Sequence, residues 1–369
     1  MIYLDNAATT KPLDSVLEYA KVYLEKFYNP SALYSAGLDV NAFLQAAREF
    51  ITAKICPAGY TCIFTSGGTE SDNTAIFSYA RRGNAVTTAG EHSAVYEAFK
   101  HLPQGVEARL ASLNKDGSVN IPDLLSKIDS KTGFVSVVHV NNETGAINDI
   151  NYISAEVKRI NPKAIFHSDG VQAFGKLPFK LAKTVDLYSV SAHKIGALKG
   201  TGALFKRTDL HLHPLIYGGG QEGDLRSGTE NVFGIAAMYK ATEEKFLQIK
   251  VNYERAAALK QRLINGLSSD ITVLSGEASS PYVVSLSAEG LKGEVLQHML
   301  EAEGIIVGTG SACSSRNHYR RILKECSYSN AVLEGVIRLS TSPETTVEEI
   351  DFAIEKINSS VEKLKKVIR

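Results

Sequence analysis

Apolar positions along the first two thirds of the chain switch repeatedly between a helical spacing and short continuous runs. Residues 15–27 carry apolar side chains at roughly a helical period, and Asn29 and Pro30 end that pattern. Residues 133–140 instead form a nearly continuous apolar run, as expected of a strand that is buried on both faces. Strands that alternate with helices in this way indicate an α/β protein with an open sheet.

The same reading places most elements of the chain. After a short opening strand, apolar runs predict strands at 61–65, 85–88, 106–110, 164–167, 186–190 and 202–205, and helical spacing predicts helices at 42–55, from the turn at 66–73 through residue 82, and at 93–101, 121–128 and 150–160. A long helical region over 232–267 is expected to bridge into a second domain, with strands at 282–286, 304–307 and 335–340 and helices at 294–301 and 347–367.

The length of 369 residues exceeds one ordinary hydrophobic core, so one large and one smaller domain are expected. We place the large domain at 12–245 and the small domain at 1–11 together with 246–369. Hydrophobic residues make up 44% of the chain and charged residues 22%, which is ordinary for a globular protein.

Charge and hydropathy argue against two classes of partner. Lys plus Arg and Asp plus Glu are balanced at 40 each, and no basic block stands out, so charge gives no argument for direct contact with nucleic acid or an anionic membrane surface. The N-terminus has no apolar core of signal-peptide length, and no later run approaches a bilayer span. We therefore expect a cytoplasmic protein.

The cysteines exclude a disulfide framework. Cys56, Cys62, Cys313 and Cys326 are too few and too scattered for one, and no C-x-x-C pair offers a metal site, so no bound metal is expected. A cysteine of this chain then either reacts or packs as a free thiol.

A glycine-rich turn lies between a predicted strand and a predicted helix. Residues 66–73 read S-G-G-T-E-S-D-N and follow the strand at 61–65. Strand, glycine turn and helix in this order point backbone N–H groups and the positive end of a helix dipole at an anion. Gly68 and Thr69 are therefore candidate anion ligands, with an ordinary turn as the alternative.

Polar residues recur at the same ends of successive strands. His92 and Asp169 each follow a predicted strand, and Lys194 lies in the turn between the strands at 186–190 and 202–205. In an open α/β sheet that edge is where ligands bind. The alternatives are a core or loop histidine, an aspartate that caps a helix and a solvated lysine.

Together these residues match the needs of an enzyme that holds an aromatic aldehyde phosphate. Gly68 and Thr69 offer an anion cradle, Asp169 an acid for a pyridine nitrogen, and His92 a flat group for the ring. A partly buried lysine beside other cations has a lowered pKa, so the amine of Lys194 is a usable nucleophile toward the aldehyde.

The motifs then resemble those of a known family. The chain carries, in order, Y-L-D-N-A-A-T-T at 3–10, F-T-S-G-G-T-E-S-D-N at 64–73, E-H at 91–92, H-V-N-N-E-T-G at 139–145, S-D-G-V-Q at 168–172, S-A-H-K at 191–194, R-S-G-T-E-N at 226–231, G-S-A-C-S-S at 310–315 and I-R-L-S at 337–340. With these motifs it resembles the cysteine desulfurases, pyridoxal-phosphate enzymes of fold type I in the class V aminotransferase group. The resemblance covers essentially the whole chain.

This resemblance implies a fold and a cofactor. The fold is a fold-type I transferase, with a large, mainly parallel seven-stranded sheet domain and a smaller α+β C-terminal domain that carries the loop of the catalytic cysteine. The cofactor is pyridoxal 5'-phosphate. The resemblance implies that Lys194 binds it covalently and later moves the proton at the substrate's α carbon, while Asp169 pairs with the ring nitrogen. Gln172 would reach the phenolic oxygen, and His92 would stack on the ring face.

Further residues are implied for the phosphate. Gly68, Thr69, Ser191 and His193 would hold it, and Thr229 would complete its site from the partner subunit. A homodimer is therefore implied as well.

For the substrate, the resemblance implies that Arg338 grips the carboxylate of L-cysteine, assisted by Asn142 and Asn29. Cys313 matches the nucleophile that takes the sulfur as a persulfide and leaves alanine. The surrounding residues 308–316 are mostly small and include a cation, which suits a reactive, movable thiol.

Several segments depart from the family pattern. Gly223 and Asp224 stand where relatives have arginine and glycine, and Tyr34 stands for a histidine. The segment after Cys313 is unusually basic, with Arg316, His318, Arg320 and Arg321, and the longer C-terminal tail of many relatives is missing. These changes leave the cofactor residues untouched and leave the sulfur acceptor and the substrate preference open.

The function expected from the sequence is therefore a cysteine desulfurase, which passes persulfide sulfur to an acceptor protein of iron–sulfur assembly or tRNA thiolation. A selenocysteine lyase and an aminotransferase on the same scaffold are the alternatives within enzymes, and transamination needs no thiol such as Cys313. A non-catalytic binding or regulatory relative is the alternative outside them.

Overall fold

The computed structural model describes residues 1–309 and 319–368. Its largest sheet has seven strands in the order β2 (Tyr60–Thr65), β8 (Gly202–Arg207), β7 (Leu187–Ser191), β6 (Ile165–Asp169), β5 (Thr132–Ser136), β3 (Asn84–Thr88) and β4 (Glu107–Ala111). Strand β8 runs antiparallel to both of its neighbours, and the pairs from β7 to β4 are parallel. The predicted mainly parallel, seven-stranded sheet is confirmed.

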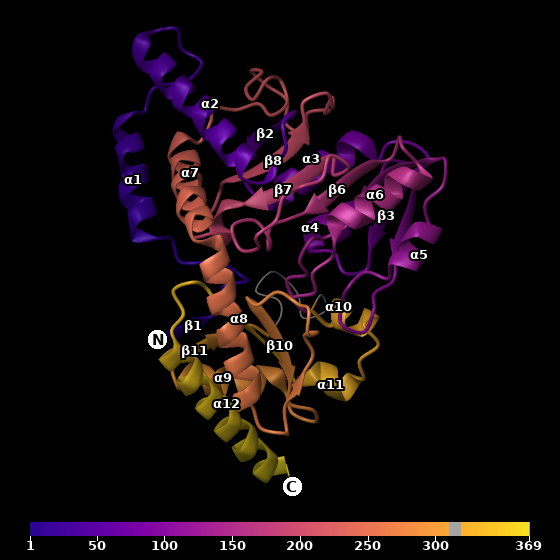
Figure 1. Cartoon of the computed structure of the whole chain (residues 1–369), viewed down its shortest axis with the longest axis vertical. Coiled ribbons are helices and arrows are strands. Elements are labelled where there is room, and N and C mark those ends of the chain that lie inside the picture. Colours follow the sequence, from indigo (N-terminus) through magenta and orange to yellow (C-terminus); the bar gives the residue numbers. More distant parts are fainter. Residues whose placement is uncertain (310–318, 369) are drawn as a thin grey trace.

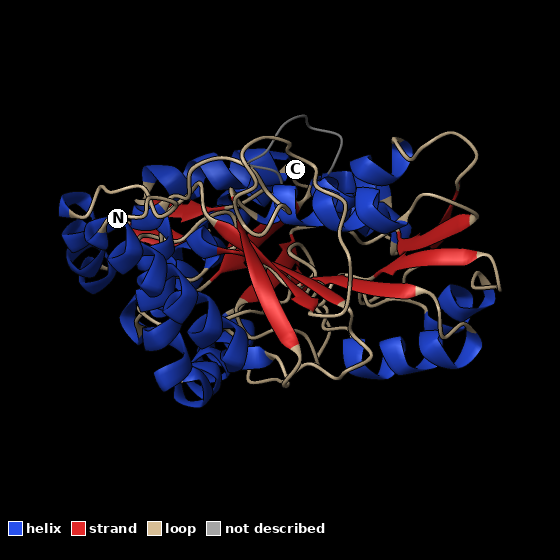
Figure 2. Cartoon of the chain, turned by 90° about the horizontal axis from the view of Figure 1, so that it is seen from above, coloured by secondary structure: helices blue, strands red, loops and turns tan. Residues whose placement is uncertain are grey.

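Helices cover both faces of this sheet, as the view from above shows (Figure 2). In chain order they are α1 (Asp14–Glu25), α2 (Ser35–Ile55), α3 (Gly68–Tyr79), α4 (Ser93–Lys100), α5 (Ile121–Ser126), α6 (Ile150–Ile160) and α7 (Val232–Leu247). Strands β3 to β7 run in the same direction, which is the reason that the polar turns predicted at their C-terminal ends gather at one edge.

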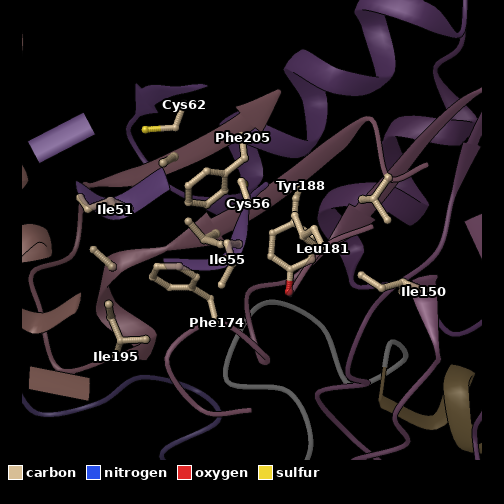
Figure 3. Packing of buried hydrophobic residues seen from close by; sticks show 14 of the residues in the cluster. Ile51, Ile55, Cys56, Cys62, Ile150, Phe174, Leu181, Tyr188, Ile195 and Phe205 are labelled. Carbon is tan, nitrogen blue, oxygen red and sulfur yellow. The ribbon is translucent and has the colours of Figure 1, made fainter. Parts of the chain in front are cut away.

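Neighbouring residues of the central strands enter different hydrophobic clusters. Val135 and Tyr188 pack with apolar residues of α2, α5, α6 and α7, in the cluster that Figure 3 shows in part. Phe134 and Leu187, one residue earlier in each strand, pack with α3 and α4 on the opposite face. Because successive side chains of a strand point to opposite faces, a sheet covered on both faces needs the continuous apolar runs seen in the sequence.

The smaller, C-terminal part of the chain has its own sheets and core. An antiparallel sheet is formed by β12 (Val336–Ser340), β10 (Val283–Ser287) and β9 (Thr272–Val273), and β1 (Ile2–Leu4) pairs in parallel with β11 (Ile305–Val307). The helices here are α8 (Ile249–Gly266), α9 (Gly293–Ala302), α10 (Tyr319–Glu325), α11 (Asn330–Glu334) and α12 (Val347–Ile368), with α8 descending from the large sheet (Figure 1). Leu4 of the N-terminal strand belongs to the core of this part. That placement supports the predicted division of the chain, whose boundaries remain a prediction.

Three elements differ from their prediction. The helical region at 232–267 is two helices, because the chain breaks at Gln248 between α7 and α8. The strand predicted at 133–140 ends at Ser136, and the residues after it bond irregularly: the N–H of His139 donates to the carbonyl of Asp169. Helix α2 begins at Ser35 rather than at 42, since Gly37 lets its first turn approach the preceding loop, where a Cβ would lie 2.8 Å from the carbonyl oxygen of Ala32.

Within residues 1–309 and 319–368, no helix combines the length and the apolar composition that crossing a bilayer requires.

Candidate active site

A cavity of about 230 Å³ lies at the C-terminal ends of the parallel strands. Ten residues that were predicted as site residues from the sequence line it: Gly68, Thr69, His92, Asn142, Asp169, Gln172, Ser191, His193, Lys194 and Arg338. They come from separate strand ends and from β12 of the C-terminal part. The fold therefore brings together most of the side chains that the motifs had indicated.

One end of the cavity is suited to a phosphate. Helix α3 begins at Gly68 and Thr69, and the first N–H groups of a helix have no partner within it. A Cβ at Gly68 would lie 2.8 Å from a methyl carbon of Val171 and 3.7 Å from the Cβ of Ser191, so a side chain here would close the space. His193 is held nearby, with Nδ1 3.0 Å from the hydroxyl of Thr9.

Lys194 ends a short 3-10 turn, Ala192–Lys194, directly after β7. Its Nζ donates to the carbonyl oxygens of Ala7 and Ala8 at 2.6 and 2.7 Å. Residues 7 and 8 belong to the N-terminal motif, so the first residues of the chain hold the amine at the cavity wall. This contact explains why that motif accompanies the lysine in the sequence.

Asp169 is the last residue of β6 and is 4% exposed. Its Oδ1 accepts the N–H of Val171 at 2.9 Å, and burial raises its pKa to about 6. Asp72 of α3 lines the same cavity, and burial followed by the charge of Asp169 raises its pKa as well. Asp169, at the end of β6, is the carboxylate that the sequence predicts for a cationic ring nitrogen.

His92 caps the N-terminus of α4. Its Nδ1 accepts the N–H of Ala94 at 3.2 Å, so the proton of the neutral ring sits on Nε2. Enclosure within the cavity, and then the cations Lys194, Arg321 and Arg338, lower its pKa to about 4. A neutral, flat ring at the cavity wall is able to stack on an aromatic ligand.

The side-chain amide of Gln172 has one backbone partner and one side-chain partner. Its Nε2 donates to the carbonyl of Ala7 at 2.8 Å, and its Oε1 accepts from Nζ of Lys176 at 2.8 Å. Ala7 therefore bonds both Gln172 and Lys194.

Arg338 of β12 is 3% exposed and joins the C-terminal part to the cavity. Its guanidinium donates to a carboxylate oxygen of Asp5 and to the carbonyl of Asn142, each at 2.8 Å. Two fixed partners from separate segments orient the planar donor fork.

Sequence reasoning did not assign to the site three charged residues that line the cavity: Asp72, Glu143 and Arg321. Glu143 is 5% exposed, its Oε2 has no hydrogen-bond partner, and burial raises its pKa to about 8. Asp72 and Glu143 lie inside the quoted motifs S-G-G-T-E-S-D-N and N-N-E-T-G, which were the available signal. Arg321 had been noted only as part of the basic segment.

Arg321 lies on α10 and reaches the strand end that carries His92. Its guanidinium lies 3.7 Å from the ring centroid of Tyr96 and donates to the carbonyl of Glu91 at 2.6 Å. It also donates to the carbonyl of Ala89. A second guanidinium thus lines the cavity beside Arg338.

Two predicted site residues, Asn29 and Thr229, are not among the described residues that line the cavity. Asn29 lies exposed between α1 and α2, and Thr229 lies exposed in the loop before α7. Cys313 lies outside the described residues, as do Arg316 and His318. Their roles remain predictions.

The other three cysteines are buried free thiols. Burial raises the pKa of Cys62 to about 11 and that of Cys326 to about 12, and it raises the pKa of Cys56 as well. Because the thiolate is the nucleophile, none of these three is reactive near neutral pH.

The buried environment of Glu91, next to His92, predicts that the stability of the folded protein depends on pH. Its side chain is fully buried, Oε1 accepts from Thr88 and Val138, Oε2 has no partner, and burial raises the pKa from 4.5 to about 8. Because the pKa of Glu91 is higher in the folded than in the unfolded protein, the contribution of Glu91 to stability is fully present below pH 4.5 and is lost as the pH rises toward 8. Glu91→Gln resembles the protonated acid. Its melting temperature should therefore equal that of wild type below pH 4.5, and should exceed it by a growing margin as the pH rises from 4.5 to 8.

Thermal unfolding followed by circular dichroism across this pH range tests the expectation. Glu254→Gln, an exposed change on α8, is the matched control and should track wild type at every pH. Melting curves of Glu91→Gln that keep a constant offset from wild type would contradict it.

The cavity's residues fit pyridoxal phosphate. The start of α3, with Ser191 and His193, offers donors for the phosphate, Asp169 offers a carboxylate for the ring nitrogen, and the amine of Lys194 suits the aldehyde. Asp72 and Asn142 line the same space, and within the described residues the buried Oδ1 atom of each has no hydrogen-bond partner. Such orphaned atoms are expected where a polar ligand belongs.

The chain is similar to known proteins over almost its whole length. The family model described as aminotransferase class-V matches residues 2–352. The cysteine desulfurase IscS of Dictyoglomus turgidum is 36% identical, over 99% of this chain and 96% of its own. Two solved structures each have a TM-score of 0.90: a NifS-like protein, 33% identical over 98% of this chain and 99% of its own, and the NifS-like protein of Rickettsia africae, 29% identical over the same shares.

Proposed function

The chain belongs to the class-V aminotransferase family, among its cysteine desulfurases, and we propose that it converts L-cysteine to L-alanine and leaves the sulfur as a persulfide on Cys313. It is a pyridoxal-phosphate enzyme. One observation carries the proposal: a single cavity gathers Lys194, Asp169 and His92 with Arg338, although they come from four separate elements.

The bound cofactor supplies an aldehyde for an amine and a ring that accepts electrons. The chain's own residues do the rest. The Lys194 amine, held by two carbonyl oxygens, is placed to take and return the proton of the substrate's α carbon. The carboxylate of Asp169 keeps a proton on the ring nitrogen, since an opposite charge favours the ionised form of each partner.

Arg338 is proposed to bind the substrate's carboxylate. The guanidinium lies at the cavity wall and is fixed by Asp5 and Asn142, so a carboxylate meets an oriented cation. Asn142, whose Oδ1 has no hydrogen-bond partner, lines the same wall and is proposed to assist it.

Cys313 is proposed as the nucleophile. The other three of the chain's four cysteines are buried with raised pKa values, which leaves this thiol as the candidate. Its thiolate attacks the substrate sulfur, the bond between that sulfur and the β carbon breaks, and the electron pair stays on carbon. One cysteine and one protein thiol then give one alanine and one persulfide, with no outside oxidant or reductant.

We propose that an acceptor protein of iron–sulfur assembly or tRNA thiolation then removes the sulfur. The ten predicted residues that line the cavity are unchanged, and of the departures from the family pattern only Arg321 lines it within the described residues. This supports the same first half of the reaction as in the family and leaves the acceptor open.

A homodimer is part of the proposal. The loop before α7, which contains Thr229, and the second half of α2 meet through an ion pair of Arg48 with Glu222 at 2.6 Å. Large apolar side chains are exposed in these neighbouring segments: Val22, Leu24, Phe27, Leu33, Tyr34, Leu38, Leu215, Ile216 and Tyr217. An exposed apolar surface of this kind marks an interface, and Thr229 lies exposed on the same loop.

Product analysis tests the proposed reaction. Holoenzyme with L-cysteine and a thiol reductant should release alanine and sulfide in equal amounts. Alanine release from L-selenocysteine should not exceed alanine release from L-cysteine. Formation of pyruvate or consumption of an added keto acid would instead indicate a lyase or an aminotransferase.

A further inference from the structure

A second buried lysine lies next to the candidate active site. Lys176 is 8% exposed and lies four residues after Gln172. It lines a neighbouring cavity of about 340 Å³, which shares Lys194 with the first. Gln172 faces one cavity and Lys176 the other, so the two side chains form part of the wall between them.

Asp14, Glu344 and Glu349 line the same second cavity, but within the described residues none of them forms an ion pair with Lys176. In residues 1–309 and 319–368 its Nζ has one hydrogen-bond acceptor, Oε1 of Gln172, at 2.8 Å. Glu344, which lines the same second cavity, is engaged by Lys245 at 2.9 Å. Burial, and then the cations Lys194, Lys245 and Arg338, lower the pKa of Lys176 to about 7. The amine has N–H donors whether it is charged or neutral, so the contact persists across this range.

The two partners of Gln172 determine which way its amide points. The carbonyl of Ala7 can only accept, so it must face the NH₂ group, and the charged amine of Lys176 can only donate, so it must face the oxygen. With Oε1 turned to Lys176, the second N–H of Gln172 is available on the cavity side, because Gln172 lines that cavity. Without Lys176, a buried amide oxygen would lose its donor.

We propose that Lys176 is a positioning residue of the cofactor site, which locks the Gln172 amide so that its N–H faces the cofactor's phenolic oxygen. This inference rests on the proposed role of Gln172. A donor to that oxygen stabilises its negative charge, which weakens the hold of the cofactor–lysine linkage on its proton. The pH midpoint of the bound cofactor's absorbance therefore reports on the lock without any turnover.

The test is a double-mutant cycle read by absorbance. Holoenzymes of wild type, Lys176→Met, Gln172→Leu and the double variant are titrated with pH, and the midpoint of the cofactor absorbance is recorded. Each single variant should raise the midpoint by about one unit. The double variant should match Gln172→Leu alone, because the lock then has nothing to hold.

Lys260→Met is the matched control. Lys260 is also a buried lysine, 9% exposed, but it donates to Ser279 and Ser280 and lies outside both cavities. It should lower the melting temperature without moving the midpoint. Lys176→Arg retains a donor and should keep a midpoint close to wild type. Lys176→Ala removes the donor with a smaller side chain, and should raise the midpoint if the methionine variant fails to fold.

The outcomes separate this inference from the function on which it rests. If Gln172→Leu moves the midpoint and Lys176→Met does not, the positioning role is wrong and the placement of Gln172 stands. If Gln172→Leu leaves the midpoint unchanged, the placement of Gln172 against the cofactor is itself wrong. An additive shift in the double variant would show that Lys176 acts directly on the cofactor and not through Gln172.

Discussion

Lys194→Ala is expected to lose turnover of L-cysteine by on the order of 10³-fold or more. The amine is the group in the cavity that both suits the aldehyde and lies where a proton can be moved, and its carbonyl partners at Ala7 and Ala8 remain in place when it is removed. The variant should fold, because the side chain is only half buried and packs no core.

The measurement pairs initial rates with covalent labelling. Reduction of the holoenzyme with borohydride followed by peptide mapping should find the cofactor on the peptide of Lys194 in wild type and on no peptide in the variant. Lys199→Ala, an exposed lysine five residues on, should behave as wild type in both assays. A Lys194→Ala enzyme that turns over within tenfold of wild type would disprove the assignment.

Asp169→Asn is expected to reduce kcat by about 10²- to 10⁴-fold. The change keeps the shape and the hydrogen bond from the N–H of Val171 but removes the negative charge from the end of β6. Without that charge the ring nitrogen is not held protonated, so the ring accepts electrons poorly. Asp72 is not expected to replace the carboxylate, because burial, the larger cause of its raised pKa, remains in the variant.

Steady-state kinetics at saturating cofactor separate this effect from a loss of binding. Asp149→Asn is the matched control: it lies exposed at the N-cap of α6, where asparagine caps as well as aspartate, and it should change neither rate nor melting temperature. A wild-type kcat in Asp169→Asn would mean that the ring nitrogen needs no charged partner in this enzyme.

The order of strands and helices along the chain could be predicted because the strands of the large sheet are buried on both faces. Runs such as 133–140 must be apolar throughout when Phe134 and Val135 enter different clusters. The ends of elements followed less well from the sequence, since they depend on contacts between distant segments. Periodicity continues through Gln248, where one helix becomes two, and it does not show that Gly37 lets α2 begin early.

The candidate site could be predicted where the residue types in a motif themselves indicate the chemistry. Lys194 and Asp169 follow strands and have few structural uses there. Lys176 and Glu143 could not be recognised in the same way, because burial distinguishes them and the sequence does not display it. Asn29 and Thr229 are exposed outside the cavity of one chain, so their predicted roles require a second subunit or another conformation.

The most direct test of the account is a single turnover without reductant. Holoenzyme is mixed with one equivalent of L-cysteine, alanine is quantified, and the protein is analysed by intact mass and peptide mapping beside Cys313→Ala. The account predicts one alanine per active site and a mass gain of one sulfur atom on the peptide of Cys313, with neither in the variant, while both proteins keep the cofactor absorbance. Alanine formation by Cys313→Ala at the wild-type level, or sulfur on Cys56, Cys62 or Cys326, would contradict it.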